Sequence, residues 1–239
     1  MGRGKVLVDG DIIAYRAAFA TQDDLPKDAE EKVDDLMKYI LDETVELPFP
    51  SKFEYQTYLT GKTNFRFDVA KSHPYKGNRK SSEKPKYLGI TRDHLVDRYS
   101  AVISVNEEAD DLISKAAAKL NYDCVVASID KDMLQIPCWH FNFNKGEWTK
   151  VDEWSGTKFF YTQILMGDAA DNIKGLNGIG PVKAKKILAE CDTEDSLWKA
   201  CVKAYDGDTE RIIENARLLW LRREEGELWE PPVSVDNTQ

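Results

Sequence analysis

Short apolar runs alternate with amphipathic segments over the first 154 residues of the chain. The runs have the length and residue types of buried strands, and they cover residues 5–8, 53–59, 101–105 and 124–129. Residues 28–44 and 107–120 instead carry apolar side chains at helical spacing. Strands that alternate with helices are typical of a parallel sheet covered by helices. We therefore predict an α/β fold with a mainly parallel sheet.

The pattern changes after Trp154. Residues 139–151 resemble a hairpin that turns at Lys145 and Gly146, and beyond Trp154 the chain has helical patterns without strand signals. We therefore predict an α/β domain over residues 1–154, a helical domain over 155–229, and a flexible tail over 230–239.

Composition describes an ordinary water-soluble protein, with 42% hydrophobic and 31% charged residues in a chain of 239. No apolar run is long enough to cross a bilayer, and the N-terminal residues carry no signal-peptide pattern. The four cysteines are dispersed and do not form a CxxC pair, which favours reduced core residues. We therefore expect a cytoplasmic protein without a membrane partner.

The net charge of −9 is unevenly distributed along the chain. Residues 23–46 carry ten acidic side chains against three lysines, a net of −7. Residues 62–98 carry ten basic side chains against four acidic ones, a net of +6, and residues 172–190 carry a net of +3. Such segregation allows local binding of a polyanion despite an acidic total. The alternative for each basic run is a solvated surface.

Acidic residues recur where predicted strands end and where a predicted helix begins. They are Asp9 and Asp11, Glu108, Asp110 and Asp111, Asp130 and Asp132, and Asp168 and Asp171. The carboxyl ends of parallel strands and the starts of the following helices share one edge of a sheet, where binding sites form. Asp168 and Asp171 are three residues apart, so on a helix they would project from the same face.

So many carboxylates raise one another's pKa unless a cation lies between them. Mg²⁺ prefers such oxygen ligands, and a pair of ions is suited to the hydrolysis of phosphodiesters. Each acidic pair taken alone has a structural alternative, because Asp and Glu also stabilise helix N-termini as caps.

A glycine-rich turn precedes a lysine-rich helix in the C-terminal part of the chain. Gly178 and Gly180 leave backbone amides accessible to a phosphate, and Lys183, Lys185 and Lys186 add attraction for a nucleic-acid backbone. This is the pattern of a helix–hairpin–helix that binds DNA without sequence preference. The alternative is a helix–turn–helix with an exposed lysine-rich face.

Taken in order, the acidic motifs and the Gly-Ile-Gly-Pro turn at 178–181 resemble the 5′→3′ exonuclease and flap endonuclease family of structure-specific 5′-nucleases. The similarity is greatest to bacteriophage members and to the 5′-nuclease domain of bacterial repair polymerases, and it extends from residue 5 to about 188. The resemblance implies a PIN-like α/β domain with a basic arch segment at about 62–98. It also implies a helix–hairpin–helix (helix–three-turn–helix) subdomain with its hairpin at 172–190.

The resemblance also assigns roles to individual residues. It implies that the first metal ion is bound by Asp9, Glu108, Asp110 and Asp130, that the second is bound by Asp132, Asp168 and Asp171, and that Asp111 supports them. Lys76 and Arg79 are the implied catalytic contacts to the scissile phosphate, although without the family they are equally well surface cations. The implied DNA contacts are Arg66, Tyr75, Lys80, Gly178, Gly180, Lys183, Lys185 and Lys186.

The chain departs from the family at the end of the second strand. Many relatives carry an acidic ligand there, whereas this chain has Leu59, Thr60 and Gly61. Either Asp11 or Asp68 takes that role, or the first ion has fewer carboxylate ligands. The arch segment is also short.

The prediction is a structure-specific 5′-nuclease that uses two Mg²⁺ or Mn²⁺ ions, with K⁺ at the hairpin turn. Its expected substrates are DNA with a 5′ end, flap or junction, and RNA–DNA hybrids, during DNA replication or repair. The resemblance further implies a monomer in the cytoplasm of a bacterium or a phage-infected cell. A replication polymerase and a single-strand-binding protein are the candidate protein partners. The alternatives are a DNA-junction binding protein that does not cleave and a PIN-type ribonuclease acting on single-stranded RNA.

Overall fold

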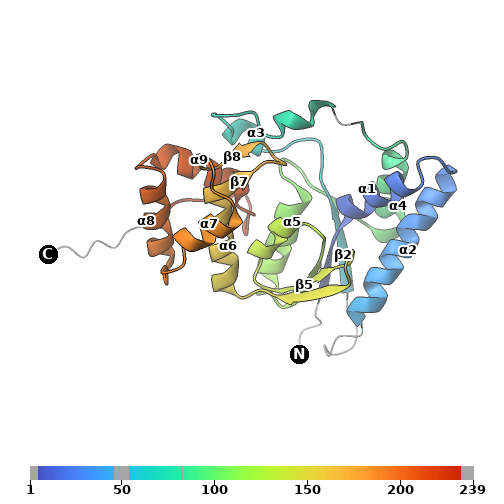
Figure 1. The fold of residues 1–239 in the computed structure, drawn as a ribbon. Helices are drawn as coiled ribbons and strands as arrows, with labels where there is room; N and C mark the ends of the chain where they lie inside the picture. The colour runs from blue at the N-terminus through green and yellow to red at the C-terminus, as the bar shows by residue number, and fades with distance from the viewer. Residues whose placement is uncertain (1–4, 46–53, 82, 233–239) are drawn as a thin grey trace. The chain divides into compact units, whose positions relative to one another are not determined.

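A computed structural model describes residues 5–45, 54–81 and 83–232 of the chain. These residues form two compact units (Figure 1). Unit 1 contains the described residues of 5–64, 83–152 and 223–225, and unit 2 contains those of 65–81, 153–222 and 226–232.

Unit 1 is built on a sheet that has six strands among the described residues, in the order β3-β2-β1-β4-β5-β6. The strands are β1 (Lys5–Asp9), β2 (Glu54–Leu59), β3 (Val102–Ile103), β4 (Cys124–Ala127), β5 (Trp139–Asn142) and β6 (Glu147–Lys150). All neighbouring strands are parallel except β5 and β6, which form the predicted hairpin. The prediction of a mainly parallel α/β sheet is therefore confirmed.

Helices cover both faces of this sheet. Figure 1 shows α1 (Gly10–Ala20), α2 (Pro26–Val45) and α4 (Leu88–Tyr99) on one side and α5 (Ala109–Lys119) on the other. Val6 and Val8 of β1 pack against the three-helix side, and Leu7, which points to the opposite face, is also fully buried. A strand that is apolar on both faces is expected in a parallel sheet. The sequence patterns did not identify α1 and α4.

Unit 2 is mainly helical, as predicted for the C-terminal part. Its elements are α3 (Arg66–Val69), the 3₁₀ helix η1 (Gly77–Ser81), α6 (Glu153–Met166), β7 (Gly167–Asp168), β8 (Ile173–Lys174), α7 (Pro181–Ile187), α8 (Glu194–Ala204) and α9 (Thr209–Leu219). Their core contains Phe160, Ile164, Leu197 and Ile212, all fully buried. No helix among the residues described in either unit is long and apolar enough to cross a membrane.

The helical prediction was wrong for residues 167–174, which form an antiparallel hairpin of β7 and β8. Gly167 has a φ of 71° and Asn172 a φ of 61°, values that a right-handed helix does not allow. The Asp168 carboxylate also accepts a hydrogen bond from the amide of Ala170 at 2.7 Å, which favours a turn over a helix. Asp168 and Asp171 therefore lie on a strand and in a turn.

The structure also locates parts of the predicted basic segment and of the predicted C-terminal tail. Residues 65–81, in the first half of the basic segment at 62–98, belong to unit 2, whereas the described residues of 83–98 belong to unit 1. In the predicted tail, Glu230 forms an ion pair with Arg217 at 2.5 Å, and residues 233–239 lie outside the described residues.

Candidate functional site

The carboxylate of Asp9 lies buried at the carboxyl end of β1, with 2% of its surface exposed. Its Oδ1 accepts a hydrogen bond from the amide of Ile12 at 3.3 Å, and its Oδ2 accepts one from the hydroxyl of Ser128 at 2.7 Å. Burial raises the pKa of Asp9 to about 7; the nearby charges of Asp11 and Asp130 also raise it, while the two hydrogen bonds oppose the shift. Asp9 is thus both a helix cap and an electrostatically costly carboxylate.

The residues after β4 are connected to Asp9 by hydrogen bonds. The hydroxyl of Ser128, which donates to Asp9, accepts the amide of Asp130 at 3.0 Å. Asp130 Oδ1 accepts the amide of Asp132 at 2.9 Å, so Asp130 caps the short 3₁₀ helix η2 (Lys131–Gln135). The ends of β1 and β4 therefore meet at one edge, as the parallel topology predicted.

The acidic residues at 108–111 open α5, as the sequence indicated. Glu108 is 8% exposed, Asp110 is half-buried, and Asp111 is fully buried. Asp111 Oδ2 accepts the amide of Glu108 at 3.0 Å, which satisfies a donor that the helix leaves without a backbone partner. Asp111 therefore stabilises the start of α5.

Asp11, the first of the two candidates for the missing second-strand acid, has structural partners. Its carboxylate forms an ion pair with Arg92 of α4 and accepts the amide of Thr60 at 2.9 Å. Asp68, the second candidate, is exposed on α3 in unit 2.

In unit 2 the predicted metal ligand Asp171 is paired with the residues predicted to contact phosphate. Arg79 Nη2 lies 2.5 Å from Asp171 Oδ1, and Lys76 Nζ lies 3.8 Å from Oδ2. The hydroxyl of Tyr75 donates to the same Oδ2 at 2.7 Å. A backbone hydrogen bond also joins the two segments, since the amide of Lys76 donates to the carbonyl of Asp171 at 2.9 Å. Ion pairs and hydrogen bonds therefore hold residues 75–79 against the turn between β7 and β8.

Two residues expected to contact DNA have a structural position instead. Arg66 is 2% exposed, and its guanidinium donates to the carbonyls of Leu218 and Trp220, each at 2.8 Å. Tyr75 is 4% exposed and packs edge-on against Phe67. Neither side chain lies on the surface, so their positions do not support the expected DNA contacts. The side chain of Lys80, a third expected contact, lies outside the described residues.

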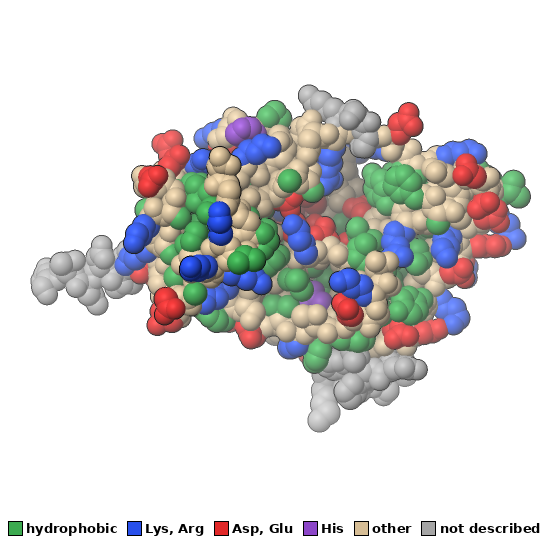
Figure 2. Space-filling view, viewed as in Figure 1, with side chains coloured by type: hydrophobic (Ala, Val, Ile, Leu, Met, Phe, Trp, Pro, Cys, Tyr) green, Lys and Arg blue, Asp and Glu red, His purple; other side chains and the backbone are tan. Residues whose placement is uncertain are grey.

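Residues 175–180, within the segment 172–190 that was predicted to contain the hairpin, lead into α7 in unit 2. Gly178 has a φ of 71°, which only glycine adopts readily, and Gly180 precedes the first turn of α7. Lys183 Nζ donates to the carbonyl of Gly178 at 2.8 Å, and Lys185 and Lys186 are exposed. Figure 2 shows Lys and Arg side chains gathered over α7.

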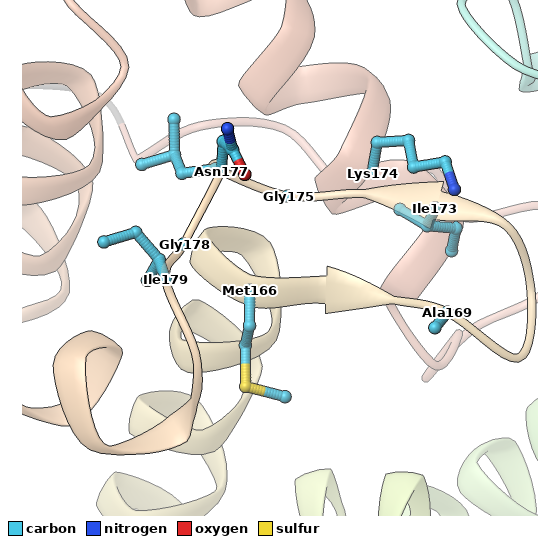
Figure 3. Close-up of a pocket in the computed structure, with 9 residues that line it drawn as sticks. Met166, Ala169, Ile173, Lys174, Gly175, Asn177, Gly178 and Ile179 are labelled. Carbon is cyan, nitrogen blue, oxygen red and sulfur yellow. The ribbon is translucent and has the colours of Figure 1, made fainter.

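A pocket adjoins this hairpin (Figure 3). Apolar side chains from Met166, Ile173 and Ile179 line it together with the backbone of the β7–β8 hairpin and of the loop that follows. Of the described residues that line it, Lys174 is the one with a charged side chain.

The donors around Asp9 have the chemistry expected for a hard cation, because they are carboxylate and hydroxyl oxygens. The raised pKa of Asp9 is the electrostatic cost that a bound cation would relieve. Within the described residues, however, no three His, Cys, Asp or Glu side chains are gathered as a ready-made metal site. The oxygen atoms around Asp9 are therefore suitable ligands for a metal ion, but the described residues do not form a complete ligand set in advance.

Three polar residues at this edge of unit 1 were not predicted as part of the site. Ser128 bridges Asp9 and Asp130, while Thr60 and Arg92 contact Asp11. Ser128 lies two residues before Asp130 in an alternating pattern, which was a usable signal. Arg92 lies 81 residues from Asp11, and no local pattern connects them.

Comparisons with known proteins agree with this fold. No model of a protein family matches the chain. DNA polymerase I of Bacillus subtilis is 33% identical in an alignment 228 residues long, which covers 82% of this chain and 24% of the polymerase. Flap endonuclease Xni of Shewanella sp. (strain W3-18-1) is 30% identical in an alignment 140 residues long, which covers 53% of each protein. The chain thus spans about a quarter of the polymerase and about half of the flap endonuclease.

The solved structure of the T5 D15 protein, co-crystallised with metal ions, has the same fold. It superposes with a TM-score of 0.65 at 18% identity, covering 91% of this chain and 89% of that one. This likeness shows the fold of the chain. Together with the sequence similarities, it supports a relation to the 5′-nuclease family.

Proposed function

We propose that this protein is a structure-specific 5′-nuclease that hydrolyses phosphodiesters near the 5′ end of DNA, including flaps, during DNA replication or repair. Similarity to a protein named flap endonuclease Xni and to DNA polymerase I supports the proposal. RNA–DNA hybrids are the second substrate class, as expected for an enzyme that removes RNA primers.

The observation that carries the proposal is the carboxylate of Asp9. It is buried at a strand end, its pKa is raised, and Ser128 links it to Asp130. A fold does not retain such a costly arrangement for stability alone, because an uncharged cap would stabilise α1 without the desolvation penalty.

The proposed cofactors are two Mg²⁺ or Mn²⁺ ions, with K⁺ at the hairpin turn. Bound divalent ions lower the pKa of water and stabilise the charge that develops on a phosphate. The proposed ligands of one ion are Asp9, Glu108, Asp110 and Asp130, supported by Asp111, and those of the other are Asp132, Asp168 and Asp171.

Cationic residues of unit 2 would supply attraction for the nucleic-acid backbone. Lys183, Lys185 and Lys186 are exposed on α7 and are suited to sequence-independent contacts with phosphates. Arg79 and Lys76 are paired with Asp171, so a phosphate that binds them competes with that carboxylate.

The test is cleavage of a panel of labelled substrates, with Mg²⁺ and with EDTA. The panel contains a 5′-flap, a blunt duplex, an RNA–DNA hybrid and free RNA. We expect the flap and duplex to be cut from the 5′ side with Mg²⁺ only. Asp130→Asn is expected to abolish cleavage while DNA binding persists, and Asp42→Asn, at an exposed acid of α2, serves as the matched control. Full cleavage by Asp130→Asn refutes the proposed site.

The second candidate is a protein that binds DNA junctions without cutting, for which the exposed lysines of α7 would supply the attraction to phosphates. This candidate predicts tight binding of the flap and no cleavage by the wild-type protein in either Mg²⁺ or Mn²⁺. A PIN-type ribonuclease would instead cut free RNA fastest in the same panel.

A further inference from the structure

Thr60, the residue after β2, is held by two charged side chains. Its amide donates to Asp11 Oδ2 at 2.9 Å, and its carbonyl accepts from Arg92 Nη2 at 2.6 Å. The other terminal nitrogen of Arg92 pairs with Asp11 Oδ1. Asp11, Thr60 and Arg92 thus form a closed ring of contacts, which we call the β2 clamp, between the start of α1, the end of β2 and α4.

The β2 clamp continues into the helix that carries the next acidic residues. The hydroxyl of Thr60 accepts the amide of Ala109 at 2.9 Å, at the first residue of α5. Glu108 precedes that residue, and Asp110 follows it. The backbone that carries both carboxylates is therefore attached to Thr60.

The end of β2 has little room to adjust. A Cβ added to Gly61 would lie 2.0 Å from the carbonyl oxygen of Ser104, so the chain after β2 packs directly against the chain after β3. The amide of Gly61 also donates to the hydroxyl of Ser104 at 2.9 Å. Small displacements of Thr60 are consequently transmitted to the loop that leads into α5.

The contacts of Asp11 argue against its serving as the missing metal ligand. Both of its oxygens are bonded, one to a guanidinium and one to an amide, and its charge is compensated by Arg92. Its side chain is 22% exposed and that of Arg92 is 25% exposed, so solvent screens the pair only partly.

We propose that Asp11 and Arg92 are positioning residues of the candidate active site, which hold Thr60 and, through its hydroxyl, keep the start of α5 with Glu108 and Asp110 in place beside Asp9. The inference rests on the proposed function, because it assigns these residues a part in binding the cation. Neither residue contacts the cation or the nucleic acid. Their effect is on the geometry of the carboxylates.

The experiment measures Mn²⁺ binding to the DNA-free protein from the loss of the free-ion signal in electron paramagnetic resonance. Arg92→Ala is expected to weaken binding by about 10- to 100-fold, as is typical when a residue that orients metal ligands is removed. Arg92→Lys keeps the charge but lacks the planar fork that bridges Asp11 and Thr60, so an intermediate loss is expected. Lys38→Ala, which removes the ion pair with Asp42 on α2, should bind Mn²⁺ like the wild type.

Kinetics add a second readout. On the flap substrate, Arg92→Ala should lower kcat and leave the KM for DNA close to that of the wild type, because the clamp does not touch DNA. Thermal unfolding identifies any variant that does not fold, in which case Arg92→Lys decides the outcome.

The outcomes separate the two proposals. If the wild type binds Mn²⁺ and a folded Arg92 variant binds it equally well, the positioning role is wrong while the proposed function stands. If the wild type neither binds Mn²⁺ nor cleaves any substrate, the proposed function fails, and the positioning role fails with it.

Discussion

Replacing Arg66 by alanine is expected to destabilise unit 2 rather than to weaken DNA binding directly. The guanidinium is 2% exposed, donates to the carbonyls of Leu218 and Trp220, and lies 4.7 Å from the centre of the Phe65 ring. It closes the C-terminal end of α9, where carbonyls lack helical partners. Truncation removes these contacts and leaves the buried carbonyl of Leu218 and the partly buried carbonyl of Trp220 without this donor.

The magnitude follows from the two hydrogen bonds. Each bond from a charged donor contributes about 1.5–3 kcal/mol, so the loss is roughly 3–6 kcal/mol. For a chain of this size, each kcal/mol lowers the Tm by about 2–4 °C. A decrease in Tm of about 6–24 °C is therefore expected for Arg66→Ala.

The assay is urea and thermal unfolding followed by tryptophan fluorescence, with DNA affinity measured on the folded protein at low temperature. Lys185→Ala is the matched control, since Lys185 is an exposed cation of the same unit and its loss should change stability by less than about 0.5 kcal/mol. If Arg66→Ala unfolds at the same urea concentration as the wild type but binds DNA weakly, the burial argument is refuted. Arg66 would then be the DNA contact that the sequence suggested.

Three further changes test other parts of the structure. Lys115→Met leaves Glu107, which is 3% exposed, without the ammonium group at 2.6 Å and should cost about 3–5 kcal/mol in urea unfolding; an unchanged midpoint contradicts this. Although partial burial favours the neutral acid, hydrogen bonds from the hydroxyl and amide of Ser72 lower the pKa of Glu214. The stability that Glu214 adds is therefore present above its unfolded pKa and lost as the pH falls. The loss in free energy of unfolding caused by Glu214→Gln should consequently become smaller in acid. A loss that does not change with pH contradicts this role of Glu214. Lys186→Ala should weaken binding to duplexes of any sequence and reduce the salt dependence (the slope of log K against log salt) by about 0.9, whereas an unchanged slope excludes a phosphate contact.

Local patterns were sufficient for the parts of the site that depend on neighbours in sequence. The strands that end at Asp9 and near Asp130, and the helix that begins after Glu108, follow from apolar periodicity and acidic caps. Parallel topology then brings the strand ends to one edge. The predicted sheet and the meeting of Asp9 with Ser128 and Asp130 have this origin.

Contacts between distant segments decided the rest. Arg66 is buried because carbonyls 152 and 154 residues away accept its hydrogen bonds. The charge of Asp11 is compensated by the guanidinium of Arg92, 81 residues away. Asp171 lies in a hairpin turn, where Arg79 reaches it, since positive φ angles at Gly167 and Asn172 prevent a helix. Periodicity records which side of an element is apolar, but only the tertiary structure determines which charges and carbonyls meet. The sequence therefore determined the sheet and its acidic edge, and the fold decided which of the candidate side chains remain available for a ligand and which are held by other residues.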